Sequence, residues 1–385
     1  MSDVKISGVQ VGTHTRIIDV QATSASYTVF IGAHILEHAG KLVRESVRSA
    51  DATKAYLVSD TNVEPLYAAT VEKSLVAAGF TVYTHNFAAG EASKRINTLS
   101  DLLEGLAQAG LSRKDVVVAL GGGVVGDIAG LAAGLYLRGI GVIQMPTSLL
   151  AMVDSSVGGK TAIDLEAGKN LAGVFLQPRA VIADVSCLDT LSAELFRDSC
   201  GEVIKHAVLA DPTLFSQLSA KALTQHNYTH DELIDIIARN ITIKRDVVQA
   251  DETEEGLRQV LNLGHTIGHA IEAASHFELG HGSCVAAGLC CMVRGAVGLG
   301  WCTPQLLDTI ETVVAAHGLP TDTALDHDVL FTYACRDKKR LSDKAHLVVP
   351  TKIGHVTIKT VGTDILKQVI DKGCLSASAP SSTNA

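Results

Sequence analysis

Hydrophobic residues in the first 185 positions fall into short runs rich in β-branched residues, separated by longer stretches with helical spacing. The clearest runs cover residues 55–59, 81–84, 115–120 and 141–145. Each run has the length of a buried strand, and each intervening stretch is long enough for a helix. Because parallel strands need such crossovers, the pattern predicts a parallel β-sheet wrapped by helices.

Beyond residue 189 the strand-like runs nearly disappear. Apolar side chains in residues 233–243 and 310–314 recur at the spacing of one helix face. The exceptions are two short β-branched runs at residues 346–349 and 355–358, which predict a pair of strands. The second half of the chain is therefore expected to be helical.

These patterns predict two domains and two terminal segments. We expect an α/β nucleotide-binding domain with a parallel sheet in residues 25–188 and an all-α domain in residues 189–374. Residues 1–24 are expected to form an N-terminal extension. Residues 375–385 are small and polar, and they are expected to form a disordered tail.

Charge and composition exclude several classes of partner. The net charge is −9, and a protein that binds nucleic acid needs a basic surface, so no nucleic-acid partner is expected. No run of about 18 uncharged apolar residues is present, so no membrane span is expected. The eight cysteines include no C-x-x-C pair, which indicates reduced thiols in a cytoplasmic protein.

A glycine motif follows the strand-like run at residues 115–120. Gly121, Gly123 and Gly126 satisfy G-x-G-x-x-G between a predicted strand and a predicted helix. Backbone amides at such a helix N-terminus can bind a pyrophosphate, which favours a dinucleotide. Close packing of the helix on the strand would also require glycine, and the motif alone does not separate these explanations.

Lysines occur in the next glycine-rich segments. Lys160 and Lys169 are flanked by Asp154 and Asn170. The segment is not a phosphate-binding P-loop, because the first glycine of that motif would fall at Val153. A flexible backbone that carries lysines suits an anionic small molecule, although a solvated loop would have the same composition.

The helical half contains a candidate metal site. Glu202 is followed by Lys205, and His265, His269 and His281 lie further along the chain. A carboxylate and two histidines from separate segments would leave one position open on a divalent zinc ion, which is typical of catalytic sites.

The spacing of the histidines leaves their roles open. His265 and His269 are four residues apart and share a helix face, but Thr266 stands where a zincin protease has glutamate. Spacing neither chooses between these two ligands nor excludes His276. Each could also be an ordinary core or surface histidine.

Taken together, these segments resemble the 3-dehydroquinate synthases, a family of sugar phosphate cyclases. The resemblance covers about residues 25–370 and rests on blocks in the family order: residues 121–127, 136–139, 144–161, 168–170, 201–205, 261–270 and 337–339. It implies an NAD-binding α/β domain and a helical domain that binds zinc or cobalt and the substrate. It also implies a homodimer.

The resemblance further implies a lyase of the shikimate pathway, which leads to aromatic amino acids. The expected substrate is a sugar phosphate, 3-deoxy-D-arabino-heptulosonate 7-phosphate, and the products are 3-dehydroquinate and phosphate. NAD would oxidise the substrate transiently, phosphate would be eliminated, and the hydride would return before ring opening and aldol closure.

The family motifs assign roles to individual residues. The metal ligands would be Glu202, His265 and His281. NAD would contact Asp60, Asn62, Glu91, Lys94, Gly122, Gly123, Asp127, Thr147, Ser148, Asp154, Lys160, Lys169 and Thr190. The substrate would contact Asp154, Lys160, Asn170, Lys205, Lys244, Arg258, Asn262, His269 and one of Lys338 and Lys339. Arg138 would reach the phosphate site of the partner subunit.

The chain departs from the family pattern in three places. Ser283-Cys284 replaces a common Glu-Ala after His281, Ala88-Ala89 replaces a proline, and Ser148 replaces a threonine. Loss of the glutamate is expected to alter the support of the metal ligand. Another sugar phosphate cyclase, a metal-dependent polyol dehydrogenase and an inactive scaffold are the alternatives. Lys244, Arg258, Asn262 and His269 keep the dehydroquinate pattern, which argues against another cyclase, and the intact lysines and metal ligands argue against a scaffold.

Overall fold

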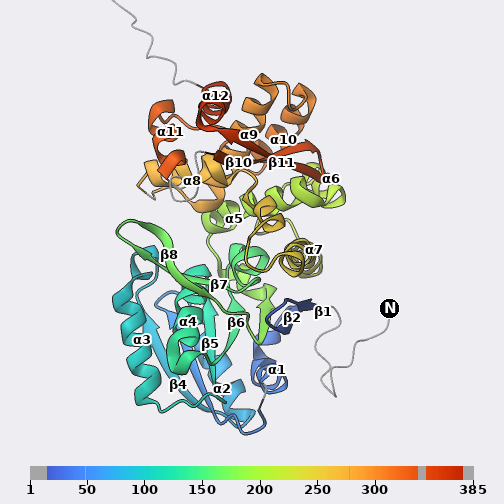
Figure 1. Ribbon diagram of the computed structural model, residues 1–385. Coiled ribbons are helices and arrows are strands. Elements are labelled where there is room, and N and C mark those ends of the chain that lie inside the picture. The colour runs from blue at the N-terminus through green and yellow to red at the C-terminus, as the bar shows by residue number, and fades with distance from the viewer. Residues whose placement is uncertain (1–14, 48, 277, 337–343, 376–385) are drawn as a thin grey trace, which may run out of the picture. The chain divides into compact units, whose positions relative to one another are not determined.

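The computed structural model describes residues 15–47, 49–276, 278–336 and 344–375. The chain divides into two compact units (Figure 1). The first, here called the sheet unit, comprises Met1–Leu191 and Tyr228–Thr253. The second, here called the helical unit, comprises Ser192–Asn227 and Glu254–Ala385.

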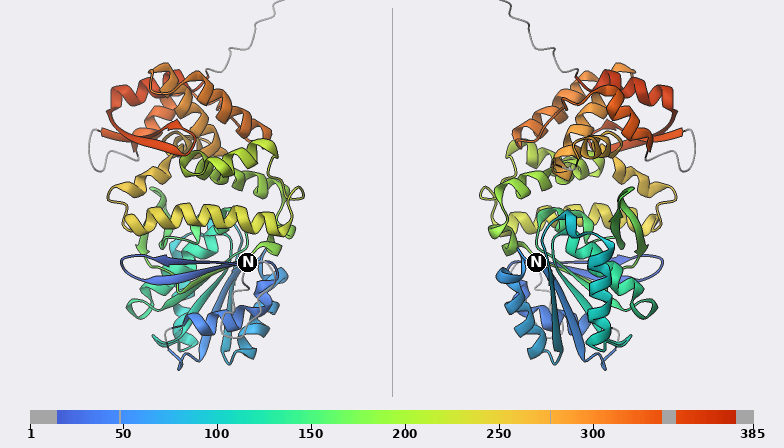
Figure 2. Two further views of the ribbon diagram at one scale, coloured as in Figure 1. Left: turned by 90° about the vertical axis from the view of Figure 1, so that its right-hand side faces the viewer. Right: turned by 90° about the vertical axis from the view of Figure 1, so that its left-hand side faces the viewer.

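A seven-stranded sheet forms the centre of the sheet unit, in the order β1-β2-β9-β6-β5-β3-β4. Every neighbouring pair is parallel except β1 and β2. The strands fan out in the side views of Figure 2, as the twist of a parallel sheet requires. They are β1 (Arg16–Gln21), β2 (Ser26–Gly32), β3 (Lys54–Asp60), β4 (Thr81–Phe87), β5 (Val116–Gly121), β6 (Gly141–Pro146) and β9 (Ala180–Asp184). The four runs that predicted strands lie in β3, β4, β5 and β6.

Helices and short turns connect these strands. The longer helices of this unit are α1 (Ala39–Ser46), α2 (Ala69–Ala77), α3 (Ile96–Gln108), α4 (Gly123–Leu135) and α7 (His230–Ala250). The short ones are η1 (Ile35–His38), η2 (Glu64–Ala68), η3 (Glu91–Ser93), η4 (Tyr136–Arg138), η5 (Ala151–Ser155) and η6 (Val185–Thr190).

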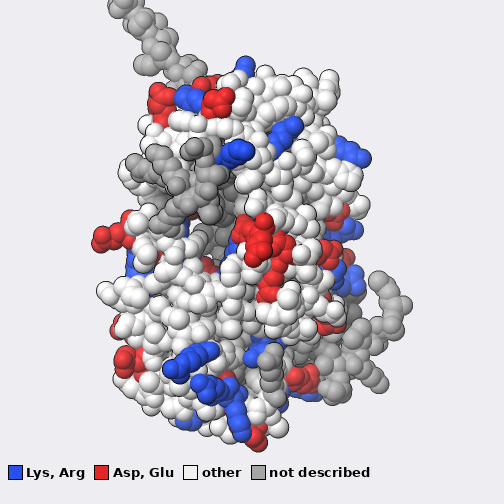
Figure 3. Space-filling view, viewed as in Figure 1, with Lys and Arg blue, Asp and Glu red and all other residues white. Residues whose placement is uncertain are grey.

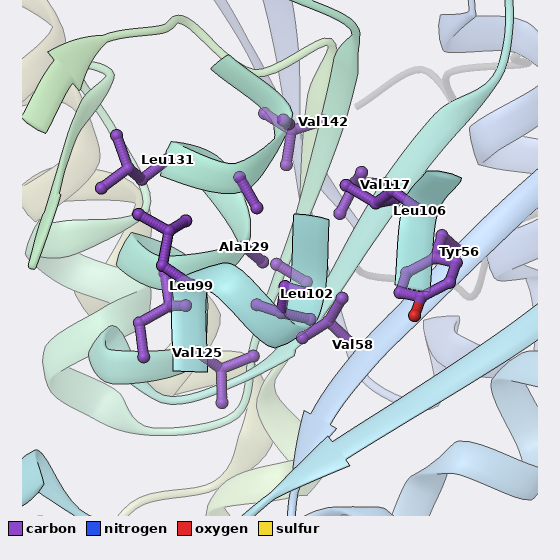
Figure 4. Packing of buried hydrophobic residues seen from close by; sticks show 14 of the residues in the cluster. Tyr56, Val58, Leu99, Leu102, Leu106, Val117, Val125, Ala129, Leu131 and Val142 are labelled. Atoms are coloured by element: carbon purple, nitrogen blue, oxygen red, sulfur yellow. The ribbon is translucent and has the colours of Figure 1, made fainter. Parts of the chain in front are cut away.

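Alternating side chains of the sheet build its core. Tyr56 and Val58 are two positions apart on β3, and Val117 of β5 is in register with Tyr56, so all three lie on one face of the sheet. They belong to one hydrophobic cluster with Leu102 of α3 and Val125 of α4 (Figure 4). β5 is buried at every position, because the sheet is covered on both faces. The predicted parallel α/β fold is confirmed.

Three expectations about this unit need correction. Residues 16–21 were expected in an extension, but Ile18 and Val20 are buried and place β1 at the sheet edge. The glycine-rich segments with lysines form a hairpin, β7 (Lys160–Leu165) and β8 (Gly168–Phe175), because their backbones pair antiparallel. Residues 1–14 of the expected extension lie outside the described part.

Helix α7 was expected in the helical domain, but it belongs to the sheet unit. It packs against β1, β2 and η5 of the sheet unit. A capping box of Thr229 and Glu232 begins this helix. Its apolar face correctly predicted a helix, but that face does not specify the neighbour against which it packs.

The helical unit is built around α9 (His281–Gly298), which contacts α5, α8, α10 and α12. The other elements are α5 (Ala193–Ala210), α6 (Pro212–Ala220), η7 (Leu257–Asn262), α8 (His265–Ala274), α10 (Pro304–Ala316), α11 (His327–Arg336), β10 (Lys344–Lys352), β11 (His355–Gly362) and α12 (Thr363–Gly373). The predicted strand pair is confirmed by β10 and β11, which are antiparallel. Of the expected tail, 375–385, only Leu375 is described.

The described surface agrees with the acidic composition. Most of the face in Figure 3 is uncharged, and its basic side chains occur in small separate groups. Among the described residues, no helix combines the length and hydropathy needed to cross a bilayer.

Candidate functional site

Three helices of the helical unit bring together the side chains of the candidate metal site. Glu202 lies within α5, whereas His265 and His281 are the first residues of α8 and α9. Gly264, with φ of 79°, precedes His265 in the left-handed conformation that glycine adopts most easily. The ends of two helices are thus fixed against the middle of a third.

The geometry of this cluster suits a tetrahedral ion. The Nε2 atoms of His265 and His281 lie 3.3 and 3.4 Å from the same atom, Oε1 of Glu202. Ligands about 2.0–2.1 Å from zinc lie about 3.3–3.4 Å from one another in a tetrahedron. Both carboxylate oxygens of Glu202 are buried and accept no well-oriented hydrogen bond within the described residues. The three residues therefore fit a divalent metal with a fourth position left for substrate.

Hydrogen bonds orient both imidazoles. His265 Nδ1 lies 3.1 Å from the carbonyl oxygen of Leu263, and His281 Nδ1 lies 3.3 Å from Oε2 of Glu272. With each Nδ1 donating its proton there, Nε2 is the ring nitrogen of each histidine that is directed at Glu202 and available to a metal once it is unprotonated.

The other histidines considered from the sequence lie differently. The ring of His269 packs edge-on 5.0 Å from that of His265, and His269 forms a second group of potential ligands with Glu272 and His281. His276 is exposed and belongs to neither group within the described residues.

Buried charges set the protonation of the cluster. Burial raises the pKa of Glu202, but Lys205, whose Nζ lies 2.5 Å from Oε2, acts together with His265 and His281 to hold the pKa well below its usual value. Burial and the charge of Lys205 lower the pKa of His265 to about 4. Burial also lowers the pKa of His281, but Glu202 and Glu272 prevail and raise it to about 10.

Metal binding should therefore release one proton per ion at neutral pH. His265 is already neutral and Glu202 already ionised, so only His281 must lose a proton to become a ligand. We expect the affinity of the protein for the metal ion to rise about tenfold per pH unit between about pH 6 and 9. Calorimetry in buffers of different ionisation enthalpy measures the proton count. Release of two protons, or an affinity independent of pH, would contradict these charge states.

The helical unit also buries cations that suit an anionic substrate. Lys205 and Arg258 are each about 1% exposed. Asn262 donates a hydrogen bond from Nδ2 to Oε1 of Glu254, 2.9 Å away, which fixes its amide. The remaining substrate candidates of this region, Lys338 and Lys339, lie outside the described residues.

The glycine motif of the sheet unit fits both explanations considered from the sequence. Gly121 ends β5, Gly122 caps α4, and Gly123 begins it, so amides of the first helical turn are available to a pyrophosphate. A Cβ atom at Gly126 would lie 2.7 Å from Oε1 of Gln144. A side chain at Gly126 would therefore displace the end of the Gln144 side chain, whereas Gly122 and Gly123 form the start of the helix.

The other NAD candidates lie at the carboxyl edge of the parallel sheet. Asp60 ends β3 and accepts hydrogen bonds from the amides of Asn62 and Val63. Glu91 and Lys94 follow β4, Thr147 and Ser148 follow β6, and Thr190 ends η6 after β9. Ligands of open α/β sheets bind at this edge. The structure thus brings residues far apart in sequence to one rim.

Lys94 links this rim to the β7–β8 hairpin. Its Nζ lies 2.6 Å from Oδ2 of Asp127 and donates to Oδ1 of Asn170 at 2.5 Å. Lys169 Nζ lies 3.3 Å from Oε1 of Glu91. Burial raises the pKa of Asp127 to about 6, against the opposing effect of Lys94.

A cavity of about 500 Å³ opens beside these residues within the sheet unit. Its lining includes Asp127, Asp154, Lys160, Asn170 and Lys244. Lys244 Nζ lies 2.7 Å from Oδ1 of Asp154 and also donates to the Asp154 carbonyl. The volume is typical of a small-molecule site.

Arg138 is exposed and lies apart from this cavity. Leu137 and Arg138 have φ of 50° and 67°, a conformation that costs energy in residues other than glycine. Strained residues of this kind are concentrated at functional sites. Among the described residues, Arg138 has no ion-pair or hydrogen-bond partner.

Three carboxylates of the helical unit were missed by the sequence reasoning: Asp198, Glu254 and Glu272. Glu272 had a usable signal, because it lies seven residues after His265 and shares its helix face. Asp198 and Glu254 act through contacts that sequence spacing does not reveal.

Comparisons with solved structures support the fold and the type of site. A 2-deoxy-scyllo-inosose synthase, solved with carbaglucose-6-phosphate, NAD+ and Co2+, has a TM-score of 0.83 at 25% identity and covers 93% of this chain and 100% of its own. A 2-epi-5-epi-valiolone synthase from Streptomyces hygroscopicus, with NAD+ and Zn2+ bound, has a TM-score of 0.81 at 24% identity, with coverage of 90% and 96%. An iron-containing alcohol dehydrogenase shares the fold at a TM-score of 0.63 and 15% identity, covering 90% of this chain and 97% of its own.

Sequence comparison identifies the family. Residues 84–198 match the family model described as 3-dehydroquinate synthase N-terminal, and residues 199–340 match the C-terminal one. The 3-dehydroquinate synthase of Clostridium acetobutylicum is 38% identical over 90% of this chain and 96% of its own. That of Nostoc punctiforme is 40% identical over 92% and 99%. The chain therefore belongs to the 3-dehydroquinate synthase family.

Proposed function

We propose that this protein is a 3-dehydroquinate synthase that converts 3-deoxy-D-arabino-heptulosonate 7-phosphate to 3-dehydroquinate and phosphate. The observation that carries the proposal is the cluster of Glu202, His265 and His281 at tetrahedral spacing, with the buried cation of Lys205 beside it. Such a cluster suits a substrate that offers both hydroxyl oxygens and an anionic group. Membership in the family supplies the specific reaction.

When bound, NAD would accept and return a hydride, and zinc or cobalt would act as a Lewis acid on substrate oxygens. The candidate ligands of the metal are Glu202, His265 and His281. Those of NAD are at the carboxyl edge of the sheet, around Gly122 and Gly123.

Each unit contains cationic side chains that are candidates to bind an anionic substrate. Lys205 and Arg258 are buried, so they can form charge-assisted hydrogen bonds worth about 1.5–3 kcal/mol each. Lys160 and Lys244 line the cavity of the sheet unit, where an anionic group would compete with Asp154 for Lys244. His269 would lie close to the phosphate and serve in proton transfer.

The direct test is product formation. Metal-loaded protein is incubated with the heptulosonate phosphate and NAD, and phosphate and dehydroquinate are quantified. We expect equal amounts of both products, and we expect a chelator to abolish them. Product formation from a different sugar phosphate, without dehydroquinate from this one, would favour another cyclase.

We also propose a cytoplasmic homodimer in which Arg138 completes the partner's phosphate site. Coexpression of Arg138→Ala with the inactive His281→Ala should yield hybrids with one intact site. With random pairing, about a quarter of wild-type activity should return. Activity that stays at the level of the two single variants would show that Arg138 does not act across the dimer. The exposure of Arg138 and its strained backbone support this role. The eight cysteines form no disulfide among the described residues, which supports the location.

A further inference from the structure

His281 is held in the helical unit by two carboxylates that the reaction itself does not require. One, Asp198, contacts the backbone at the start of α9. The other, Glu272, contacts the imidazole ring. Since the usual glutamate after this histidine is replaced by Ser283, the source of support for His281 has to be found elsewhere in the chain.

Asp198 fixes the start of α9. Its Oδ2 accepts a hydrogen bond from the amide of Gly282 at 3.1 Å, and its Oδ1 accepts one from the amide of Ser283 at 2.8 Å. Asp198 lies four residues before Glu202 on α5, so both carboxylates belong to one face of that helix. The backbone of His281 is thus set relative to Glu202.

Glu272 fixes the ring. Its Oε2 lies 3.3 Å from Nδ1 of His281, on the opposite side of the imidazole from Nε2, which faces Glu202. Glu272 is 5% exposed, so water competes little for this contact. The second histidine, His265, has only a neutral carbonyl oxygen at the same ring position. A carboxylate acceptor makes a histidine a stronger metal ligand than a carbonyl does.

We propose that Glu272 is a positioning residue that holds His281 in the tautomer and orientation required for metal binding. The inference rests on the proposed function, because it assumes that Glu202, His265 and His281 bind the ion. Glu272 supports His281 in place of the usual glutamate, which Ser283 replaces in this chain. The carboxylate comes from α8 in space instead of from the residues after His281.

A competing possibility is that Glu272 is itself a ligand, with His269 and His281, because these three also offer atoms within 4.8 Å of one another. The observed contact argues against it. Glu272 meets Nδ1 of His281, and an ion bound there would have to displace that hydrogen bond. Nε2, with Glu202 and His265 around it, offers a complete site without any such displacement.

The test compares Glu272→Ala and Glu272→Gln with Glu278→Ala as control. Glu278 is an exposed carboxylate between α8 and α9 with no side-chain partner among the described residues. Zinc affinity is measured by competition with a chromophoric chelator, and the cobalt-loaded proteins are compared by visible absorption. We expect Glu272→Ala to bind one ion about 10–100-fold more weakly, with a shifted cobalt spectrum. Glu272→Gln still offers an acceptor oxygen, so it should fall between Glu272→Ala and wild type. Glu278→Ala should match wild type.

The outcomes separate this inference from the proposed function. Affinities within twofold of wild type in both Glu272 variants would overturn the positioning role. Complete loss of the ion in both variants would instead make Glu272 a ligand, which also overturns it. If Glu272→Ala does not fold, the glutamine variant decides alone, with at least threefold weaker binding expected. Failure of the wild-type protein to bind zinc or cobalt would overturn the proposed function, whatever the variants do.

Discussion

His281→Ala should lose bound metal and catalytic activity together while the protein remains folded. The substitution removes one of three converging ligands and leaves Glu202 and His265, which alone hold an ion weakly. Loss of a Lewis acid worth several kcal/mol corresponds to a fall in kcat of about a thousandfold or more. Elemental analysis after gel filtration and a steady-state assay measure the two effects.

His276→Asn is the matched control for this experiment. His276 is exposed, and its φ of 53° is tolerated by asparagine, so the substitution should leave metal content and activity unchanged. One equivalent of tightly bound metal in His281→Ala would mean that the ligand set is different. Equal losses in both variants would point to a general effect of histidine removal.

Gly282→Ala should strongly destabilise the helical unit. A Cβ atom at Gly282 would lie 1.8 Å from the carbonyl oxygen of Asp198, and one at Gly201 would lie 2.0 Å from the carbonyl oxygen of Gly282. Because these contacts involve backbone atoms, no side-chain rotation relieves them, and α5 and α9 must separate. We expect a loss of about 3 kcal/mol in the free energy of unfolding, or more.

The same separation would move His281 away from Glu202, so metal affinity should fall with stability. Denaturant unfolding of the metal-free protein isolates the packing effect, and Ser283→Ala on the same turn of α9 is the control. An unfolding midpoint equal to that of wild type would show that the two helices have room to adjust.

The sequence predicted correctly those strands of the sheet unit that are buried on both faces. Residues 116–120 are apolar because β5 is covered on both faces, and an unbroken apolar run is the signature of such a strand. β1 was missed because only Ile18 and Val20 of this edge strand are buried, and the charged Asp19 separates them. The apolar face of α7 predicted a helix, but the same face would fit either unit.

The candidate metal site was likewise predicted only in part from the sequence. Residue types and spacing singled out Glu202 and three histidines, and the family resemblance named His265 and His281 as ligands. Spacing could not make that choice, because the separation of Nε2 and Oε1 atoms depends on how α5, α8 and α9 pack. Asp198 was missed for the same reason, because its contact with the start of α9 joins segments that are distant in sequence. Glu272 shares a helix face with His265, but its contact with His281 also depends on how α8 and α9 pack.

The central claim is that the protein eliminates phosphate through a redox cycle that leaves NAD unchanged. The most direct measurement gives metal-loaded protein one equivalent of NAD and an excess of 3-deoxy-D-arabino-heptulosonate 7-phosphate, and follows phosphate release and absorbance at 340 nm together. We predict many equivalents of phosphate and dehydroquinate per NAD, with no net accumulation of NADH. NADH formation in proportion to substrate consumed, without phosphate release, would contradict the claim and identify a polyol dehydrogenase.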